Sequence, residues 1–394
     1  MRFKKLIGKL HLWLGLSSGL LVLFLGITGC ILAFQQEIEN ASQSYRYVSK
    51  DNKALLTPSH IRSIAEAELP GKHAHSVKYQ DGRNAVVTFY NSEPAYYYLV
   101  YVNPYSGKVL KVKDMSTDFF RVVIMGHYYL WLPPNIGQPI VASGTLIFVI
   151  LLISGLVLWW PKNAAARRKR FTVKLNAQWR RVNYDLHNVL GFYMTWIAIF
   201  IAISGLVMGF QWFSKSVYWI SSGGKAMVQY YPALSDSTIT KTTFKEKAED
   251  ILWLRMQGDW KHKGGSFEVH FPENQKESIE LAFNPDTDTY WKTDYRFFDQ
   301  KTLKEIEVTH LYGKLSEAST ADKIMRMNYD IHVGAIWGLP GKILVFFASL
   351  LAASMPVTGF LIWRGRRKKS KATTGAKLLQ TRKAKLKISS SVVN

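Results

Sequence analysis

Four long apolar segments constrain the fold more than any other feature of the sequence. They cover residues 12–34, 140–160, 186–213 and 343–363. Each reaches the roughly 20 residues that a helix needs to cross a bilayer. The first segment is longer than the apolar core of a signal peptide, roughly 7–15 residues, and no small-residue cleavage site follows it. The sequence therefore predicts an α-helical membrane protein with four transmembrane helices.

The excess positive charge of the chain is confined to three segments that flank these helices. The chain has 51 Lys and Arg residues against 28 Asp and Glu residues, a net charge of +23. Residues 1–10, 162–181 and 364–394 contain 23 of the cations and no acidic residue, so the rest of the chain is balanced. The positive-inside rule places these three segments in the cytoplasm. Membrane topology thus accounts for the charge, and we expect no nucleic-acid partner.

The predicted helices divide the chain into eight segments, with both termini in the cytoplasm. The first half contains transmembrane helix 1 (1–36), an extracytoplasmic module (37–120), and a histidine-bearing segment that leads into transmembrane helix 2 (121–161). A basic cytoplasmic loop (162–183) connects the halves. The second half contains transmembrane helix 3 (184–213), a second extracytoplasmic module (214–328), transmembrane helix 4 (329–363) and a basic cytoplasmic tail (364–394).

The two halves repeat one pattern of residues. In helices 1 and 3 a histidine, His11 or His187, is followed at offsets 4, 17, 18, 23 and 24 by Gly, Thr or Ser, Gly, Phe and Gln. In helices 2 and 4 a histidine precedes Trp and Pro, and a Ser-Gly or Thr-Gly pair follows at 154–155 and 358–359. We therefore interpret the chain as a tandem duplication of helix, module and helix.

Each segment between the helices has the pattern of a small α+β module. The first contains a predicted helix at 57–67, predicted strands at 85–90, 96–102 and 108–112, and a turn at 103–107. The second contains a predicted helix near 245–254, predicted strands at 266–271, 278–283 and 295–298, and a turn at 284–286.

One histidine lies at or just before the amino-terminal end of each predicted transmembrane helix. Helices 1 and 3 start inside, so His11 and His187 are expected near the cytoplasmic face, whereas His127 and His332 are expected near the external face. An ionisable side chain at membrane depth is costly and marks a functional site. Neutral imidazole is also an axial ligand of haem iron. The histidines therefore predict two bis-histidine haem sites, one at each face.

Glycines beside these histidines support the same interpretation. A residue four positions along a helix lies on nearly the same face, so Gly15 and Gly191 stand next to the histidines of helices 1 and 3 and leave room for a flat macrocycle. Eighteen residues make about five helical turns, so Gly29 and Gly205 return to that face near the other end, where the second haem would lie.

A simpler explanation exists for any one of these positions. Histidines are common polar residues at membrane surfaces, and glycines in transmembrane helices commonly permit close packing. Four histidines that topology pairs, and that repeat in register with glycines, favour haem binding. The single cysteine, Cys30, excludes a C-x-x-C-H attachment. The sequence therefore predicts two b-type haems held without thioether bonds.

These motifs resemble the PepSY-associated transmembrane family over nearly the full length of the chain. The resemblance is carried by residues 127–133, 154–161, 185–191, 331–334 and 357–363, and by the turn at 102–109. Residues 298–305 are a second copy of this turn, with Leu303 where a glycine is usual. The resemblance implies a bacterial inner-membrane di-haem protein that reduces ferric siderophores at the periplasmic face and takes part in iron uptake.

Three functions are consistent with the sequence. The first is a di-haem electron carrier that reduces an iron chelate docked between the modules, with one-electron chemistry supplied by the cofactor and not by a side-chain acid or base. No Gly-rich dinucleotide fingerprint is visible, so electrons would come from a separate cytoplasmic reductase or from quinol. The second is a non-enzymatic membrane protein whose modules bind a peptidase or another partner. The third is a transporter of haem or iron.

Overall fold

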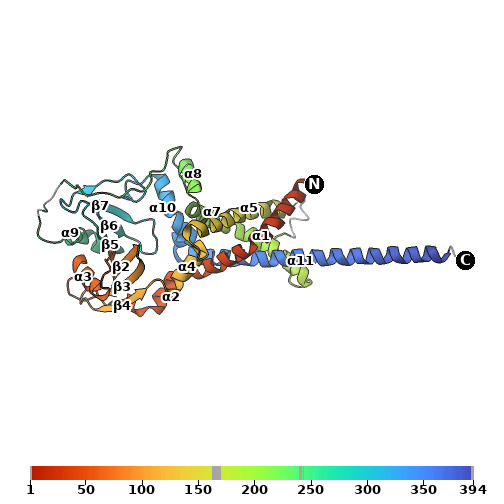
Figure 1. Cartoon of the computed structure of the whole chain (residues 1–394), viewed down its shortest axis with the longest axis horizontal. Helices are drawn as coiled ribbons and strands as arrows, with labels where there is room; N and C mark the ends of the chain where they lie inside the picture. The colour runs from red at the N-terminus through yellow and green to blue at the C-terminus, as the bar shows by residue number, and fades with distance from the viewer. Residues whose placement is uncertain (1, 162–169, 239–241, 243, 392–394) are drawn as a thin grey trace. The chain divides into compact units, whose positions relative to one another are not determined.

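The computed structural model describes residues 2–161, 170–238, 242 and 244–391. Contacts divide the chain into two compact units, whose elements Figure 1 labels. We call Met1–Cys30, Ile140–Ile203 and Phe346–Asn394 the membrane unit, and Ile31–Pro139 and Ser204–Val345 the sheet unit. Part of the predicted basic loop, residues 162–169, lies outside the described residues.

Four helices in the described part of the chain are long and apolar enough to cross a membrane. They are α1 (Arg2–Ala33), α5 (Pro134–Trp159), α7 (Trp179–Gly209) and α11 (Gly338–Ser391). Only 22–39% of each apolar window is buried within the protein, which leaves most of this surface for lipid. The four predicted transmembrane helices are thus observed as helices, and α11 continues beyond its apolar part into the basic tail.

Small residues bring the helices of the membrane unit close together. A Cβ on Gly26 of α1 would lie 2.8 Å from both the Ala353 Cβ and the Ser349 carbonyl oxygen of α11. A Cβ on Gly144 of α5 would meet the end of the Leu21 side chain of α1. Because lipid removes the usual hydrophobic drive for helix association, van der Waals packing at such small residues contributes to the attraction between spanning helices.

Short helices that were not predicted lie next to the spanning helices. α1 ends at Ala33, and α2 (Gln35–Ser42) begins after Phe34; in the same way α7 ends at Gly209, and α8 (Gln211–Ser221) begins after Phe210. α4 (Phe119–Tyr129) precedes α5, and α10 (Thr320–Val333) precedes α11. Helix 4 was predicted as one helix over 329–363, but Gly334 has a left-handed φ of 79° and a short 3₁₀ turn, η2 (Ala335–Trp337), separates α10 from α11.

The described residues of the sheet unit form one eight-stranded antiparallel sheet in the order β4-β3-β2-β1-β5-β6-β7-β8. Its strands are β1 (Ser76–Gln80), β2 (Ala85–Ser92), β3 (Ala95–Val102), β4 (Val109–Asp114), β5 (Ser266–His270), β6 (Ile279–Asn284), β7 (Asp294–Phe298) and β8 (Glu305–Ile306). The six predicted strands correspond to β2–β7. Each predicted module supplies four strands, and the pairing of β1 with β5 joins the modules into one sheet.

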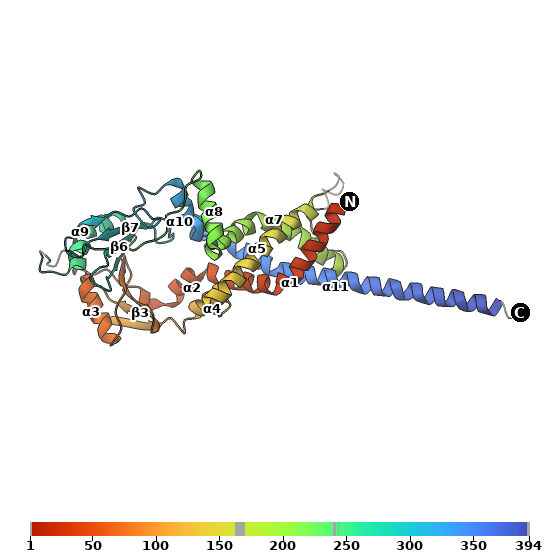
Figure 2. The same cartoon turned by 45° about the horizontal axis from the view of Figure 1, so that its top comes forward.

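Two helices cover one face of this sheet and close its core (Figure 2). α3 (Pro58–Glu68) and α9 (Ala248–Lys263) correspond to the two predicted module helices. Their side chains Ile61 and Trp253 are buried against alternate strand residues such as Val77 and Val269. Because side chains alternate along a strand, the intervening residues of β5 and β6 point to the other face, and most of them are polar.

The turn that carries the family resemblance has the same conformation in both modules. Asn103 accepts hydrogen bonds through its side chain from the backbone two and three residues on, and so does Asp299. The first turn ends at Gly107 with a φ of 74°, and the second ends at Leu303 with a φ of 56°. The second module therefore keeps the turn with a leucine in the left-handed region that glycine usually occupies.

Candidate functional site

His11 of α1 and His187 of α7 line the same cavity in the membrane unit. The cavity has a volume of about 410 Å³, which is within the range of ligand-binding pockets. Its charged lining includes Arg170 and Arg366. Glycines from all four spanning helices contribute to its walls: Gly8, Gly15, Gly19, Gly155, Gly191 and Gly359. The structure thus brings the first predicted histidine pair, which we call the membrane-unit pair, together with the two glycines predicted beside it.

A hydroxyl group lies beside Nδ1 of each imidazole in this pair. His11 Nδ1 lies 2.8 Å from Ser154 Oγ of α5, and His187 Nδ1 lies 2.8 Å from Thr358 Oγ1 of α11. Each hydroxyl is also 3.1 Å from a carbonyl oxygen one turn earlier in its own helix. When the hydroxyl donates its one proton to that carbonyl, it accepts from imidazole Nδ1–H. In this arrangement both Nε2 atoms keep their lone pairs available for a metal ion.

The glycines next to this pair line open space. A Cβ on Gly15 would meet only Leu151, at 3.8 Å, and a Cβ on Gly191 would meet only the Met355 sulfur, at 3.4 Å. These contacts are ordinary, unlike those at Gly26, where a Cβ would overlap the neighbouring backbone. Gly15 and Gly191 are therefore not needed for close helix packing, and their small size serves the cavity.

Two further glycines make room for the imidazole rings. A Cβ on Gly155 would lie 3.5 Å from His11 Cε1, and a Cβ on Gly359 would lie 3.3 Å from His187 Cε1. Each follows the serine or threonine that contacts the same ring. In each Ser-Gly or Thr-Gly pair, the serine or threonine thus supplies a hydroxyl partner for one histidine, and the glycine leaves space for its imidazole ring.

His127 of α4 and His332 of α10 form the second pair, which we call the sheet-unit pair. Their ring centroids are 6.3 Å apart and their planes are inclined by 68°. Two imidazoles that bind one metal ion from opposite sides at about 2 Å have centroids about 6 Å apart. His332 Nδ1 lies 3.0 Å from Ser204 Oγ of α7. Burial, and to a lesser extent the neighbouring His332, lowers the pKa of His127 to about 3, which keeps it in the neutral, metal-binding form.

The second predicted glycine pair lies on the spanning helices next to hydroxyl residues. Gly29 is on α1 after Thr28, and Gly205 is on α7 after Ser204, the partner of His332.

Within the described residues, no group of three or more His, Cys, Asp or Glu side chains could hold a metal ion. Each histidine pair offers two ligands, the number that a haem iron accepts in addition to its four porphyrin nitrogens.

A seven-residue motif ends at one histidine of each pair and was not predicted from the sequence. Arg, Asn, Tyr, Asp and His occur with identical spacing in α7 and α10, as Arg181, Asn183, Tyr184, Asp185, His187 and as Arg326, Asn328, Tyr329, Asp330, His332. The predicted repeat aligns helix 1 with helix 3 and helix 2 with helix 4, whereas this motif aligns helix 3 with the segment before helix 4. Its identical spacing is the signal in the sequence.

The asparagine of this motif supports the hydroxyl partner of the histidine. Asn183 Nδ2 donates to the Thr358 carbonyl at 3.1 Å, and Asn328 Nδ2 donates to the Ser204 carbonyl at 3.1 Å. Each asparagine therefore holds the residue whose hydroxyl meets the imidazole four positions later. Such outer partners orient a metal-binding histidine and tune its basicity.

The aspartate of the motif is buried in both helices but has different partners. Asp185 is 3% exposed and accepts a hydrogen bond at 2.9 Å from Nε of Arg181, which lies in the same helix. Asp330 is fully buried and accepts hydrogen bonds from the backbone N–H groups of Tyr290 and Trp291, both at 2.9 Å. In α10 the motif therefore holds both the hydroxyl partner of the histidine and, through Asp330, the helix that carries it.

A comparison with protein families matches residues 9–366 to the PepSY-associated transmembrane region. The match includes both histidine pairs, both modules and all four apolar segments. A search of curated proteins finds no match to the chain.

Proposed function

The chain belongs to the PepSY-associated transmembrane family, and we propose that it is a di-haem b electron carrier that reduces a ferric siderophore or a similar iron chelate. The observation that carries this proposal is the pairing of four histidines, three of which have a hydroxyl at Nδ1. An imidazole that is oriented through Nδ1 presents Nε2 to a metal ion. Two such rings suit a haem iron, which has four porphyrin nitrogens and needs only two axial ligands.

The residues that line the cavity of the membrane unit support a haem there. His11 and His187 would supply the axial nitrogens, and Gly15 and Gly191 would border the macrocycle. Arg170 and Arg366 would neutralise the two propionate groups, because guanidinium groups match carboxylates in geometry and charge. A haem bound in this way supplies one-electron chemistry. The protein's part is to hold the imidazoles neutral and oriented and to exclude water.

The polar face of the sheet is the surface that we assign to the iron chelate. Tyr230 and Tyr312 are 60% and 45% exposed, and Tyr312 packs against Tyr295 of β7. Exposed aromatic side chains suit an organic chelator, which presents both apolar and hydrogen-bonding surface. We place this unit in the periplasm of a bacterial cell and the basic segments in the cytoplasm, following the positive-inside rule. Electrons would then enter from a cytoplasmic reductase or from quinol.

The haem content and visible spectrum of the purified chain test this proposal. We expect two b-type haems per chain, both extractable with acidified acetone, and the bands of six-coordinate low-spin iron. A folded but colourless protein would contradict the proposal and support the non-enzymatic binding function. Haem that is bound but exchanges freely, with no reoxidation by ferric chelates after reduction, would support transport.

A further inference from the structure

The two short helices that carry the sheet-unit pair are each tied to the sheet by a buried carboxylate. We propose that Asp330 and Asp118 are positioning residues, which make the separation of His332 and His127 depend on the sheet. The assignment of these histidines as haem ligands rests on the proposed function. The positioning rests on the hydrogen bonds of Asp330 and on the ion pair of Asp118 with Lys113.

Asp330 holds α10 to the turn between β6 and β7. Its two oxygens each accept one backbone N–H, from Tyr290 and from Trp291, at 2.9 Å. One turn earlier, Arg326 donates to the carbonyls of Thr293 and Gly313, at 2.6 and 3.2 Å. Residues four apart share a helix face, so one face of α10 is fixed to the β6–β7 region at two successive turns.

These contacts are not needed to form the helix. α10 already has a complete capping box, in which Ser319 and Asp322 satisfy each other's backbone N–H groups. Asp330 lies near the opposite end, two residues before His332, and is fully buried. A buried carboxylate is costly unless it is well hydrogen-bonded, and it stabilises a fold less than apolar packing does. Its specific effect is therefore on the position of the last turn, which carries His332.

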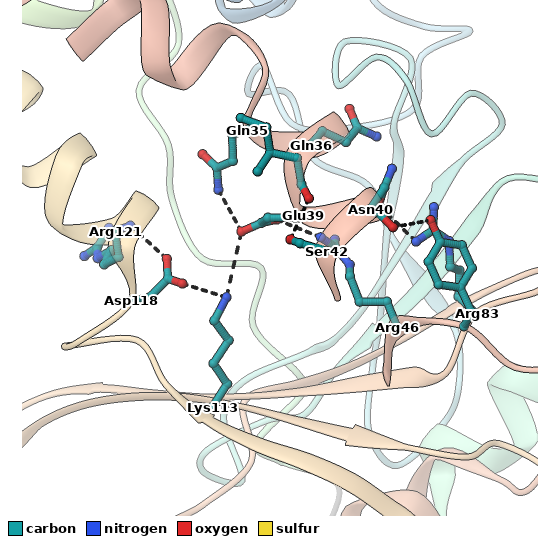
Figure 3. Close-up of polar contacts among 12 residues, drawn as sticks. Gln35, Gln36, Glu39, Asn40, Ser42, Arg46, Arg83, Lys113, Asp118 and Arg121 are labelled. Carbon is teal, nitrogen blue, oxygen red and sulfur yellow. Dashed lines mark hydrogen bonds and ion pairs between the residues drawn. The ribbon is translucent and has the colours of Figure 1, made fainter. Parts of the chain in front are cut away.

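Asp118 holds α4 to the edge strand β4 in a comparable way. It caps α4 by accepting from Arg121 N at 2.9 Å, and it pairs with Lys113 Nζ of β4 at 2.7 Å. Lys113 also lies 3.8 Å from Glu39 of α2, which pairs with Arg46 at 2.7 Å (Figure 3). Lys113 and Glu39 are each only 12% exposed. The network therefore joins α2, β4 and the start of the helix that carries His127.

Both histidine helices thus take their positions from one sheet, one from β4 and the other from the β6–β7 turn. The separation of the two rings therefore depends on both contacts.

Asp330→Asn in the full, haem-loaded chain tests the proposal, with Asp322→Asn as the matched control on the same helix. An asparagine can accept only one of the two backbone N–H groups. We expect Asp330→Asn to shift the midpoint potential and the low-spin resonance signals of one haem and to leave the other unchanged. Asp322→Asn should lower the Tm and move neither signal. If Asp330→Asn changes only the Tm, Asp330 has no positioning role.

A distance measurement that does not need haem distinguishes a failure of the positioning role from a failure of the proposed function. Spin labels at Val122 of α4 and Ile324 of α10, both at least 36% exposed, report the spacing of the helices once Cys30 is replaced by serine. We expect a wider distance distribution in Asp330→Asn than in Asp322→Asn. A chain that binds no haem but shows this widening would overturn the proposed function alone. Identical distributions would overturn the positioning role.

The ion pair between Asp118 and Lys113 provides an independent variant in case Asp330→Asn does not fold. Lys113→Met leaves Asp118 without its cation, whereas Lys111→Met changes an exposed lysine of the same strand. We expect the first to widen the label distance and the second to leave it unchanged. Equal distributions for the two lysine variants would refute the role of Asp118.

Discussion

The two histidine pairs use the same local chemistry in different surroundings. In each unit, an asparagine holds the backbone of a serine or threonine whose hydroxyl meets the histidine. The membrane-unit pair lies on two spanning helices, beside a cavity lined with glycine. The sheet-unit pair lies on two short helices that buried carboxylates tie to the sheet. The geometry of one histidine pair therefore depends on the packing of spanning helices, and that of the other depends on the fold of the sheet.

Substitution of single histidines should have the largest effect on haem content, because it acts on one pair and not on the other. We expect His11→Ala and His187→Ala to affect one haem, and His127→Ala and His332→Ala to affect the other, because each change removes one of two axial ligands. The haem-to-protein ratio should fall from two toward one, and retained five-coordinate iron should give a high-spin signal. His73→Ala, at an exposed position of the first module, serves as the control and should change neither. The pairing is wrong if His11→Ala and His127→Ala perturb a common haem.

Glycine substitutions should separate the cavity from the helix packing. We expect Gly15→Leu to fill the open space beside His11 and to remove one haem, with little change in the free energy of unfolding. Gly26→Leu, the matched control on the same helix, forces α1 and α11 apart. Such overpacking costs about 1–3 kcal/mol. Gly26→Leu should therefore lower the Tm and lose both haems together, as followed by thermal melts and haem spectra. Joint loss of both haems in Gly15→Leu would show that this glycine serves packing.

Loss of the hydroxyl partners should have a smaller effect, confined to one site each. Ser154→Ala removes the acceptor of His11 Nδ1–H, and Ser204→Ala removes the partner of His332. Mutation of such outer partners typically costs about 10–100-fold in metal affinity. We expect each variant to weaken one haem by this factor in competition with apomyoglobin. Ser354→Ala, which loses only a bond within α11, is the control and should bind haem as the parent chain does.

The histidine pairs could be predicted because they depend on features that the sequence repeats. Charge asymmetry and apolar length determine topology, and topology alone pairs His11 with His187 and His127 with His332. The glycines at 15 and 191 follow from helical spacing and do line the cavity. The short helices α4 and α10 were not predicted because neither contains a long apolar run, although Pro133-Pro134 and Gly334 mark the breaks.

The connections made by the sheet could not be predicted from local patterns. The pairing of β1 with β5 joins segments far apart in the chain, and neither strand contains a signal for its partner. β1 is short and has Ser76 and Lys78 on its polar face, so it lacked the apolar run that identified the other strands. Asp330 contacts backbone N–H groups, which any residue can supply, so no sequence pattern identifies its partner.

The smallest expected effect concerns the seam where β1 and β5 join the two modules. His75 Nε2 lies 3.3 Å from His270 Nδ1, and His270 lies 3.6 Å from Glu268 and 3.9 Å from Glu280. Burial, and then the neighbouring His270, lowers the pKa of His75 below 6.5. The unfolded chain therefore binds more protons than the folded chain just below pH 6.5, and folding stability falls as the pH decreases through this window.

We expect this pH dependence to act on the sheet-unit pair before the membrane-unit pair, because only the former depends on the sheet. Haem spectra recorded during acidification should show one haem lost before the other. His75→Gln has no proton to gain, so it should reduce the loss of stability below pH 6.5, measured by urea unfolding at each pH. His60→Gln, a change on the α3 helix, controls for the loss of a histidine as such. Equal profiles of folding stability against pH for the parent chain and His75→Gln would show that His75 does not cause the pH dependence. Simultaneous loss of both haems would show that the two sites are not held independently.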